Sequence, residues 1–350
     1  MSATQWPATW PCAAQEHVPL APCTTLKVGG SARWLLEPRN PDELLEAYNA
    51  CRAAGVVPRV LGGGANLIIA DGELDGVVIA TRALSRTFRP LVTDDVPTDA
   101  ALDLEGDGAG IREDAAAIGS DGTGDIRAPA YDAANPRLVA WAGASMPGLV
   151  RAASELGWTG LEGLIGVPGH LGGGVAMNAG GRWGELFDVL ELVRVVTEDG
   201  ELRDFTREEC SPSYRNGGLG ALGAALVVGA VLRLEVDTKA AVRERGREFL
   251  LEKRAAQPVT EASAGCIFKN PDATFEGERV GAGLLIDKLG LKGRRRGAAR
   301  ISPLHGNFMI NEGGATATDV IELIREVRAE VVERTGILLE IEVQRWGVDL

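Results

Sequence analysis

The sequence predicts an α+β protein, and three stretches indicate it. Between Ala32 and Gly62 an apolar strand pattern, a capped helix and a second apolar strand follow one another. A strand pair is expected around Asp199 and Gly200, because Asp-Gly is a favoured two-residue hairpin turn. Near the end of the sequence, residues 316–336 have the apolar spacing of a long amphipathic helix.

The first 83 residues predict a small α/β region that begins after a loose tail of about 20 residues. The stretch ARWLLEP is typical of a strand. Asn40 is a helix-capping residue and Pro41 favours the first helical position, so we expect a helix from there to about Gly55. The strands VVPRVLG, NLIIADG and GVVIATR are expected to follow.

Residues 93–137 interrupt this pattern. They contain eleven Asp or Glu residues against three Arg, and they are rich in Gly and Ala but poor in large apolar residues. Such a segment buries too little apolar surface to offset its chain entropy, so we expect a flexible insertion between two strands. An acidic docking segment is the alternative.

Regular structure is expected to resume with the strand RLVAWAGAS. Pro147 favours the start of a helix that Gly157 ends. After a glycine-dense stretch at residues 163–184, the Asp-Gly hairpin and the strand ALVVGAVLRLEV follow. A charged amphipathic helix over residues 238–255 is expected to connect this region to the next.

A further unit is expected from Gln257 onward. Thr316 and Asp319 have the spacing of a helix cap, and Gly336 is a stop signal. The apolar stripe of this helix consists of Val320, Ile324, Val327 and Val331. The chain is expected to close with one strand, ILLEIEVQRWG.

Charge and composition exclude several classes of protein. The net charge of −13 opposes non-specific nucleic-acid binding, and no apolar run is long enough to span a bilayer, so we expect neither partner. The first residues lack the basic and then apolar pattern of a secretory signal. The five cysteines are scattered without metal-ligand spacing, so neither a metal site nor a disulfide framework is expected. These features predict a cytoplasmic location.

Two glycine-rich stretches are candidates for binding a phosphate-bearing ligand. Gly62, Gly63 and Gly64 directly follow an expected strand, where glycines let backbone N–H groups approach an anion. They do not form the Rossmann fingerprint, since a strand follows them, and a tight turn also explains them. The second stretch, GLEGLIGVPGHLGGGVAMNAGGRWGE, is longer and denser in glycine. Two such loops separated by a helix favour a long ligand with a central diphosphate, such as a dinucleotide cofactor.

Eight motifs occur in order along the chain: TTLKVGGSARWLLEP, VLGGGANLIIAD, the glycine-dense stretch just quoted, SYRNG, SAGCIFKNP, AGLLIDKLGLKG, GNFMINEGGATATDV and LLEIEV. In sequence, order and approximate spacing they resemble those of the UDP-N-acetylenolpyruvoylglucosamine reductase (MurB) family. The resemblance covers about residues 20–348, apart from the acidic insertion. Arg215 and Cys266 are 51 positions apart, too close for the extra tyrosine loop of one class of the family, so the resemblance is to the short-loop (type II-like) class.

That resemblance implies an FAD-binding fold of the vanillyl-alcohol-oxidase (PCMH) type in two α/β subdomains, plus a C-terminal substrate-binding α+β domain. The expected regions are 1–83 and 84–256 for FAD, 257–336 for the substrate, and 337–350 as a strand that returns to the FAD domain. The implied activity is the NADPH-driven reduction of UDP-N-acetylglucosamine enolpyruvate to UDP-N-acetylmuramate, a step in peptidoglycan precursor synthesis, through noncovalently bound FAD.

The resemblance implies three catalytic residues, each of which also has a plainer explanation. Hydride addition to the vinyl carbon creates an enolate beside a carboxylate, which calls for cationic groups and a proton donor. Arg215 matches the family's arginine for this charge, but could be a surface residue at a strand end. Glu342 matches the family's glutamate, a general acid or an electrostatic partner of the substrate; in a strand it would share a face with Glu340, and such carboxylates are commonly solvated. Cys266 takes the proton-donor position, where serine is commonest, but could be a buried, inert thiol.

The resemblance also implies ligand contacts. Those with the substrate are Tyr214, Lys269 and Asn270. Those with the cofactor are Gly62, Gly63, Gly64, Ala65, Asn66, Gly143, Ala144, Ser145, Gly163, Ile165, Gly169, Gly172, Asn178, Ala179 and Gly180. Ala256 stands where the family often has a basic residue, and Gln344 where it often has arginine, which puts the diphosphate and carboxylate contacts in question.

His170 lies in the second glycine-rich stretch, and its role is open. Related flavoproteins of this fold can link FAD covalently through histidine; a noncovalent contact or a solvent-facing side chain is the alternative. Two other functions also stay open, a different flavin oxidoreductase of the same fold and a non-catalytic, reductase-like binding protein. The motifs SAGCIFKNP and LLEIEV argue against the first, whereas a cysteine that marks a lost proton donor would fit the second.

Overall fold

The computed structural model describes residues 6–90, 111–114 and 136–350. The chain divides into two compact units. The first unit consists of Met1–Gln15, Leu35–Gly63 and Val77–Leu250. The second unit consists of Glu16–Trp34, Gly64–Gly76 and Leu251–Leu350.

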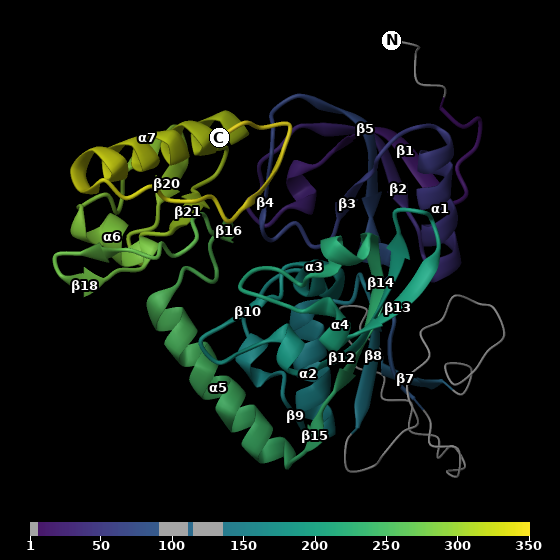
Figure 1. The fold of residues 1–350 in the computed structure, drawn as a ribbon. Helices are drawn as coiled ribbons and strands as arrows, with labels where there is room; N and C mark the ends of the chain where they lie inside the picture. The colour runs from purple at the N-terminus through teal and green to yellow at the C-terminus, as the bar shows by residue number, and fades with distance from the viewer. Residues whose placement is uncertain (1–5, 91–110, 115–135) are drawn as a thin grey trace. The chain divides into compact units, whose positions relative to one another are not determined.

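The N-terminal strands form a four-stranded sheet (Figure 1). Its order is β1 (Ala13–Pro19), β2 (Ser31–Glu37), β5 (Glu73–Ala80) and β3 (Arg59–Leu61). Helix α1 (Pro41–Ala53) follows β2, and the Asn40 side chain accepts a hydrogen bond from the backbone N–H of Glu43 at 2.8 Å. The predicted cap, helix and flanking strands are therefore confirmed, although β5 lies between β2 and β3.

The loose tail predicted for residues 1–20 is wrong in its second half, because Ala13–Pro19 forms strand β1. This strand lies at the edge of its sheet beside β2. Most of its side chains are exposed, so the strand needs no alternating apolar pattern. Backbone pairing with β2 holds it, and that pairing leaves no signal in the local sequence.

A six-stranded sheet forms the centre of the first unit. Its order is β13 (Leu202–Thr206), β12 (Leu190–Thr197), β14 (Ala224–Arg233), β8 (Arg137–Trp141), β6 (Thr87–Pro90) and β7 (Ile111–Asp114). Strands β12 and β13 form the predicted hairpin, and the residues of β8 are buried along its whole length.

Strand β7 lies inside the predicted flexible insertion and pairs in parallel with β6. The prediction is therefore wrong for residues 111–114, because backbone pairing with an open strand edge stabilises them without requiring apolar content. Residues 91–110 and 115–135, which make up nearly all the rest of the insertion, lie outside the described residues. The position of the insertion between two strands, β6 and β8, is as predicted.

Helix α2 (Met146–Leu156) is capped at both ends. The Ser145 hydroxyl accepts a hydrogen bond from the Gly148 N–H at 3.1 Å, and Gly157 has the left-handed backbone expected of a stop signal. The glycine-dense stretch contains a short helix, α3 (Leu171–Ala176), that its glycine content does not predict. The other short elements of the first unit are η2 (Thr81–Ala83), β9 (Trp158–Thr159), η4 (Glu162–Leu164), β10 (Gly180–Gly181), β11 (Gly184–Glu185), η5 (Leu186–Asp188), α4 (Arg207–Cys210), η6 (Leu219–Leu222) and β15 (Glu235–Val236).

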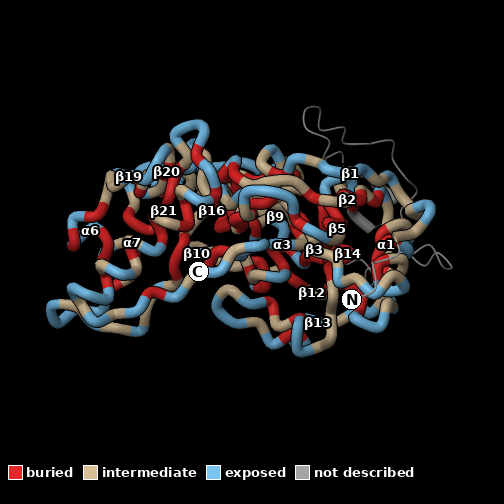
Figure 2. Tube along the Cα trace, turned by 90° about the horizontal axis from the view of Figure 1, so that it is seen from above, coloured by how far each residue is buried: buried red, intermediate tan, exposed pale blue. Residues whose placement is uncertain are grey.

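The second unit contains another four-stranded sheet, with helices α6 (Ala282–Lys288) and α7 (Ala317–Thr335) contributing to its apolar core. The sheet order is β16 (Ser263–Cys266), β21 (Phe308–Asn311), β20 (Ala299–Ile301) and β19 (Arg295–Arg296). The short elements are η1 (Ala21–Cys23), β4 (Leu67–Ile69), β17 (Thr274–Phe275) and β18 (Glu278–Arg279). The buried parts of β16, β20, β21, α6 and α7 are red in Figure 2. Helix α5 (Lys239–Ala256) is the predicted charged connector, and it contains the boundary between the units.

Helix α7 is as predicted. Thr316 and Asp319 form a reciprocal capping box, and Gly336 ends the helix with a left-handed backbone. The buried residues of α7 include the whole predicted stripe, Val320, Ile324, Val327 and Val331. The carboxylate of Asp71 adds a second cap, since it accepts hydrogen bonds from two further backbone N–H groups of the first turn, Ala317 and Thr318.

The predicted closing strand is largely wrong, because its regular part is β22 (Gln344–Trp346). This strand pairs in parallel with β4, whereas Ile341 makes an isolated bridge to Phe268. The segment changes its partner between these points, so it cannot keep one continuous pleat. Glu340 and Glu342 consequently do not share an environment, since Glu340 is exposed and Glu342 is buried. By its contacts the segment 337–350 belongs to the same compact unit as residues 257–336.

Within the parts of the chain that the structure describes, none of the helices is both long enough and apolar enough to span a membrane.

Candidate active site

A cavity of about 260 Å³ in the first unit is lined by both glycine-rich stretches. Gly62 lines it from the first stretch and Gly172 from the second. Strand β14 contributes residues 224–227, and the remaining wall is mostly apolar, with Thr81 and Asn216 as polar exceptions. A pocket with apolar walls and exposed backbone at glycines suits a ligand that has both flat apolar and anionic parts.

Some of the predicted cofactor glycines are needed for close backbone contact. A Cβ atom on Gly63 would lie 2.5 Å from the Cα of Gly169, and one on Gly143 would lie 1.9 Å from the carbonyl oxygen of Thr81. No side chain fits at such distances. Gly62 differs, because the atom nearest to a Cβ there would be 3.9 Å away. Gly63 and Gly143 thus allow close contact between backbone segments, whereas Gly62 leaves open space beside the cavity; this space is called the glycine cradle below.

His170 is a polar side chain beside this cradle. Its Nδ1 is buried and has no hydrogen-bond partner among the residues that the structure describes. Its Cβ lies 4.0 Å from the position that a Cβ on Gly62 would occupy. Burial lowers the pKa of the imidazole, which favours the neutral ring. An unsatisfied buried nitrogen next to a cavity fits a polar group of a bound ligand.

The other predicted cofactor residues of the first unit have internal contacts. Ser145 caps α2, and Ala144 and Ala179 accept backbone hydrogen bonds with their carbonyl groups. The Asn178 side chain donates to Glu185 at 2.7 Å and accepts from the backbone N–H of Phe187 at 3.2 Å, so it serves the loop itself. Gly163 and Ile165 lie in and directly after the turn η4.

Arg215 lies in the first unit, close to the glycine-dense stretch. Its guanidinium donates a hydrogen bond to the carbonyl oxygen of Gly180 at 3.1 Å and lies over the ring of Tyr214 at 5.0 Å. Arg215 itself has a left-handed backbone conformation (φ 56°), which is uncommon for a residue with a side chain. Tyr214 is about half exposed. The predicted catalytic arginine and substrate tyrosine therefore lie beside a predicted cofactor residue.

Cys266 lies in the second unit, at the end of β16, and is partly exposed. The pairing of β16 with β21 shifts register between Ser263 and Cys266, and Gly265 in the bulge has a left-handed backbone. Bulges of this kind re-aim the side chain that follows them. The glycine before Cys266 is thus part of the geometry that sets the direction of the thiol.

Glu342 lies on a backbone segment that is hydrogen-bonded to the one carrying Cys266. The Glu342 N–H donates to the carbonyl oxygen of Ile267 at 2.8 Å, and the Glu342 side chain is buried. Asn66 of the first glycine turn donates through Nδ2 to the carbonyl oxygen of Glu342 at 3.4 Å. The second unit therefore brings together Cys266, Glu342 and Asn66, three residues that are far apart in the sequence.

Lys269 and Asn270 have partners within the second unit. Lys269 forms an ion pair with the exposed Glu340 at 3.3 Å. Ala282 is the first residue of α6, and its backbone N–H donates a hydrogen bond to the Asn270 side-chain oxygen at 3.0 Å. Both contacts fix loops that border the Cys266 segment.

Sequence reasoning missed Asn307. This buried amide clamps the backbone just after Cys266, because its Oδ1 accepts the Phe268 N–H at 2.9 Å and its Nδ2 donates to the Phe268 carbonyl at 2.7 Å. Its own carbonyl oxygen accepts the Ile267 N–H at 3.0 Å. The one sequence signal for it is a polar residue just before the apolar strand FMIN, which also suits a turn.

Sequence reasoning also missed Thr25. Its hydroxyl donates to the carbonyl oxygens of Ser263 at 2.6 Å and of Gly64 at 3.3 Å. It therefore joins the first glycine turn to the strand that ends at Cys266. No cluster of three or more metal-ligating side chains occurs in residues 6–90, 111–114 and 136–350.

Comparisons with known proteins decide the family. Residues 257–346 match the C-terminal domain of UDP-N-acetylenolpyruvoylglucosamine reductase, and residues 127–206 match an FAD-binding domain. The reductase of this name from Deinococcus radiodurans is 38% identical over 341 residues, with 96% of this chain and 97% of that protein covered. The chain belongs to the UDP-N-acetylenolpyruvoylglucosamine reductase family. The member from Moorella thermoacetica is 35% identical, with 95% of this chain and 93% of that protein covered.

The crystal structure of the family member from Thermus caldophilus has the same fold. It superposes with a TM-score of 0.68 at 33% identity and covers 95% of this chain and 98% of that one. The predicted α+β, FAD-binding fold is confirmed, and FAD is the cofactor. The glycine cradle and the unsatisfied nitrogen of His170 fit such a ligand, since it carries a diphosphate and many hydrogen-bonding groups.

Proposed function

We propose that this chain reduces UDP-N-acetylglucosamine enolpyruvate to UDP-N-acetylmuramate with NADPH, and that Cys266 protonates the carbon next to the substrate carboxylate. The main support is the hydrogen bond from the Glu342 N–H to the Ile267 carbonyl, which fixes Glu342 on the backbone next to Cys266. The region that carries both residues matches the C-terminal domain of the family.

Bound FAD, once reduced by NADPH, supplies the hydride. Gly62, Gly172 and His170 are proposed to hold it noncovalently at the cavity of the first unit, with the other predicted glycines packing the loops behind. Gly64, Ala65 and Asn66 are proposed to contribute further backbone contacts to FAD.

Arg215 is proposed to bind the substrate carboxylate, where charge accumulates as the enolate forms. A guanidinium can do this with two parallel hydrogen bonds. Its contacts with the Gly180 carbonyl and the Tyr214 ring restrict its orientation, which lowers the cost of holding it ready. Tyr214, Lys269 and Asn270 are proposed to contact the rest of the substrate.

Cys266 is chemically suited to the proton transfer. A thiol has an ordinary pKa of about 8.5, so it is mostly protonated at neutral pH yet gives up its proton far more easily than a serine hydroxyl. The bulge at Gly265 and the Asn307 clamp fix the backbone on both sides of it. Glu342 is proposed to act from the neighbouring backbone, as a second acid or as an electrostatic partner of the substrate.

The division of labour along the chain is part of the proposal. Residues 1–83 and 84–256 are assigned to FAD, residues 257–336 to the substrate, and residues 337–350 to the return of Glu342.

Turnover in variants of Cys266 tests the proposal. In Cys266→Ala we expect substrate reduction to fall by at least about 100-fold, the range for losing a general acid, while NADPH still reduces the flavin at nearly the normal rate. Cys266→Ser should keep substantial activity. Normal turnover in the alanine variant would contradict the proton-donor role. Flavin that NADPH reduces but that this substrate cannot reoxidise would contradict the whole function.

A further inference from the structure

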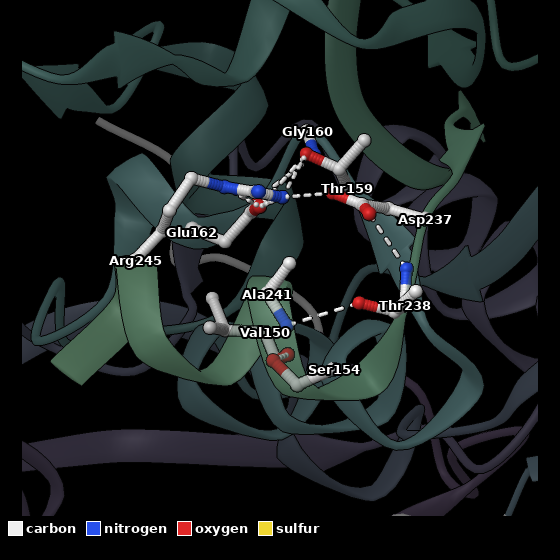
Figure 3. A network of polar contacts seen from close by, with 9 residues as sticks. All are labelled: Val150, Ser154, Thr159, Gly160, Glu162, Asp237, Thr238, Ala241 and Arg245. Atoms are coloured by element: carbon white, nitrogen blue, oxygen red, sulfur yellow. Dashed lines mark hydrogen bonds and ion pairs between the residues drawn. The ribbon is translucent and has the colours of Figure 1, made fainter.

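A buried carboxylate that none of the proposed steps uses lies in the first unit. Glu162 is 5% exposed and accepts hydrogen bonds with both of its oxygens. Its Oε1 accepts from the Thr159 hydroxyl at 2.7 Å and from Arg245 at 2.7 and 3.1 Å, and its Oε2 accepts from the Gly160 N–H at 2.6 Å. Figure 3 shows these groups converging on it.

The network continues from Arg245 into the start of helix α5. Arg245 also donates to Asp237 at 2.7 Å and to Thr159 at 3.0 Å. Asp237 in turn accepts the backbone N–H of Thr238, whose hydroxyl accepts the Ala241 N–H in the first turn of α5 (Figure 3). Glu162 is thus tied both to its own loop and to a long helix.

Glu162 lies directly beside predicted cofactor residues in the sequence. It is the first residue of η4, and two predicted cofactor residues, Gly163 and Ile165, follow within three positions. The Glu162 carbonyl oxygen accepts the Ile165 N–H at 3.0 Å. Gly160, on the other side, has a backbone angle of φ +122° that strongly favours glycine. The loop is therefore bent sharply at Gly160, and the carboxylate fastens the bend.

Helix α5 also contacts this loop directly through Gly246 and indirectly through Phe249. A Cβ on Gly246 would lie 3.4 Å from the Ile165 side chain, so the helix backbone passes close to that residue. Phe249, four residues after Arg245, stacks on Trp183 with ring centroids 5.3 Å apart. A Cβ on Gly163 would lie 2.3 Å from the Trp183 carbonyl oxygen, so Trp183 contacts the loop in turn. Helix α5 therefore packs against the loop directly at Ile165 and indirectly through Trp183.

The chemistry of the network requires a carboxylate. Burial alone raises the pKa of Glu162, but hydrogen bonds from Thr159, Gly160 and Arg245 outweigh it and hold the pKa below its ordinary value. A carboxylate accepts at every lone pair, whereas a glutamine would turn an NH₂ group toward Arg245 or the Gly160 N–H. That substitution would leave a buried donor unsatisfied and release the bend.

We propose that Glu162 is a positioning residue for FAD binding, which holds Gly163 and Ile165 in the shape that contacts the cofactor and is itself held by Arg245. The inference rests on the cofactor contacts proposed above for Gly163 and Ile165. It adds to them a residue that reaches the cofactor through the loop rather than by touching it.

The test is a titration of purified apoprotein with FAD, followed by flavin fluorescence, at a temperature where each variant is folded by circular dichroism. We expect the Kd for FAD to rise about ten-fold in Glu162→Gln and in Arg245→Gln, as when one buried hydrogen-bonding group is left unsatisfied. The absorption band of the bound flavin should shift as well. With FAD in excess, the KM for UDP-N-acetylglucosamine enolpyruvate should stay unchanged.

Arg243→Gln is the matched control. Arg243 lies two positions away on the same helix and forms an ion pair with Glu155 at 2.6 Å, and it donates no hydrogen bond to Thr159, Gly160 or Glu162 among the described residues. We expect its Kd for FAD and its flavin spectrum to equal those of the unsubstituted protein. A merely structural role for Glu162 would lower the melting temperature of the apoprotein but leave both readouts of the folded protein unchanged.

Equal Kd values and flavin spectra in all of these proteins would overturn the inference. If Glu162→Gln does not fold, Arg245→Gln carries the comparison, because Glu162 keeps Thr159 and Gly160 as partners there. The proposed function can fail separately. If the protein binds FAD but does not reduce the substrate, the Kd values for FAD still test the role of Glu162.

Discussion

The loop at residues 160–172 and the strand that ends at Cys266 are held in place by different means. The first relies on glycines that let backbones touch and on one charged centre, Glu162 with Arg245. The second relies on a neutral amide, Asn307, and on the apolar core of its unit behind it.

The difference fits the roles proposed above for the two regions, diphosphate binding by the loop and proton transfer by Cys266. A loop that holds a diphosphate must present backbone donors at close range, and side chains on it would interfere. A thiol that must stay protonated until it reacts is better fixed by uncharged groups, since a nearby cation would stabilise the thiolate. Four predictions separate the two kinds of support.

The largest effect is expected for Asn307→Ala. It leaves the N–H and the carbonyl of Phe268 without their partner, and each unsatisfied buried group costs about 1–3 kcal/mol, so the free energy of unfolding should fall by about 2–6 kcal/mol. Urea denaturation measures this. Asn270→Ala, which removes one acceptor at an exposed site, should cost under about 1 kcal/mol. Equal losses of unfolding free energy in the two variants would contradict a larger contribution of Asn307 to stability.

Gly63→Ala tests the close backbone contact of the other region. Its new Cβ would meet the Gly169 Cα at 2.5 Å, and overpacking of this kind costs about 1–3 kcal/mol. We also expect weaker FAD binding, because the two stretches must separate. Gly181→Ala is the control, since no atom lies within 4 Å of its added Cβ. Thermal unfolding and FAD titration measure the melting temperature and the Kd for FAD of both variants. Similar values in the two would contradict a steric role for Gly63.

Thr25→Val should have a smaller effect, confined to the second unit. It removes the hydroxyl that donates to Ser263 and Gly64, a loss of about 1 kcal/mol for a typical hydrogen bond. Thr25→Ser keeps the hydroxyl and should be close to neutral. Denaturant midpoints of the two variants check this, and a serine variant as unstable as the valine one would point to the methyl group instead.

The smallest effect concerns pH, and it involves one histidine in each unit, His170 and His305. Burial lowers the pKa of His170, and burial together with Lys292 lowers that of His305. As the pH falls from about 6.5, the unfolded chain takes up protons before the folded one, so stability should decline from that point down to the folded-state pKa values.

His305→Asn separates the two contributions. The His305 Nδ1 accepts the Asn307 N–H at 3.1 Å, and an asparagine oxygen can take that place without titrating. Melting temperatures between pH 7.5 and 5 should therefore fall less steeply in the variant. An unchanged slope would assign the pH dependence to other groups.

The local elements of the fold could be predicted from the sequence because their signals are local. Asn40 caps α1, Gly157 ends α2, and the stripe of α7 faces its core, each as expected. The strand β1 and the segment before β22 could not be predicted in this way. Their conformation depends on which strand edges lie beside them, and their own side chains show no period.

For the site, the motifs point to Cys266, Glu342 and Arg215, whereas their supporting residues leave little trace in the sequence. Asn307 and Thr25 are 41 residues after and 241 residues before Cys266 in the sequence, and they act through backbone groups that any residue could provide. Glu162 lies inside a recognised motif, but its value as a carboxylate depends on Arg245 arriving from another element.

By itself, the sequence determined the α+β class, the capped helices, the glycine-rich loops and the residues that match the family's chemistry, because each depends on a few neighbouring positions. Tertiary structure alone decided that Glu340 is exposed and Glu342 buried, since a change of strand partners separates two residues that a regular pleat would place together. It also decided which polar groups hold the strand that ends at Cys266 and the loop at residues 160–172. Hydrogen bonds between distant segments are set by packing, and no local pattern encodes them.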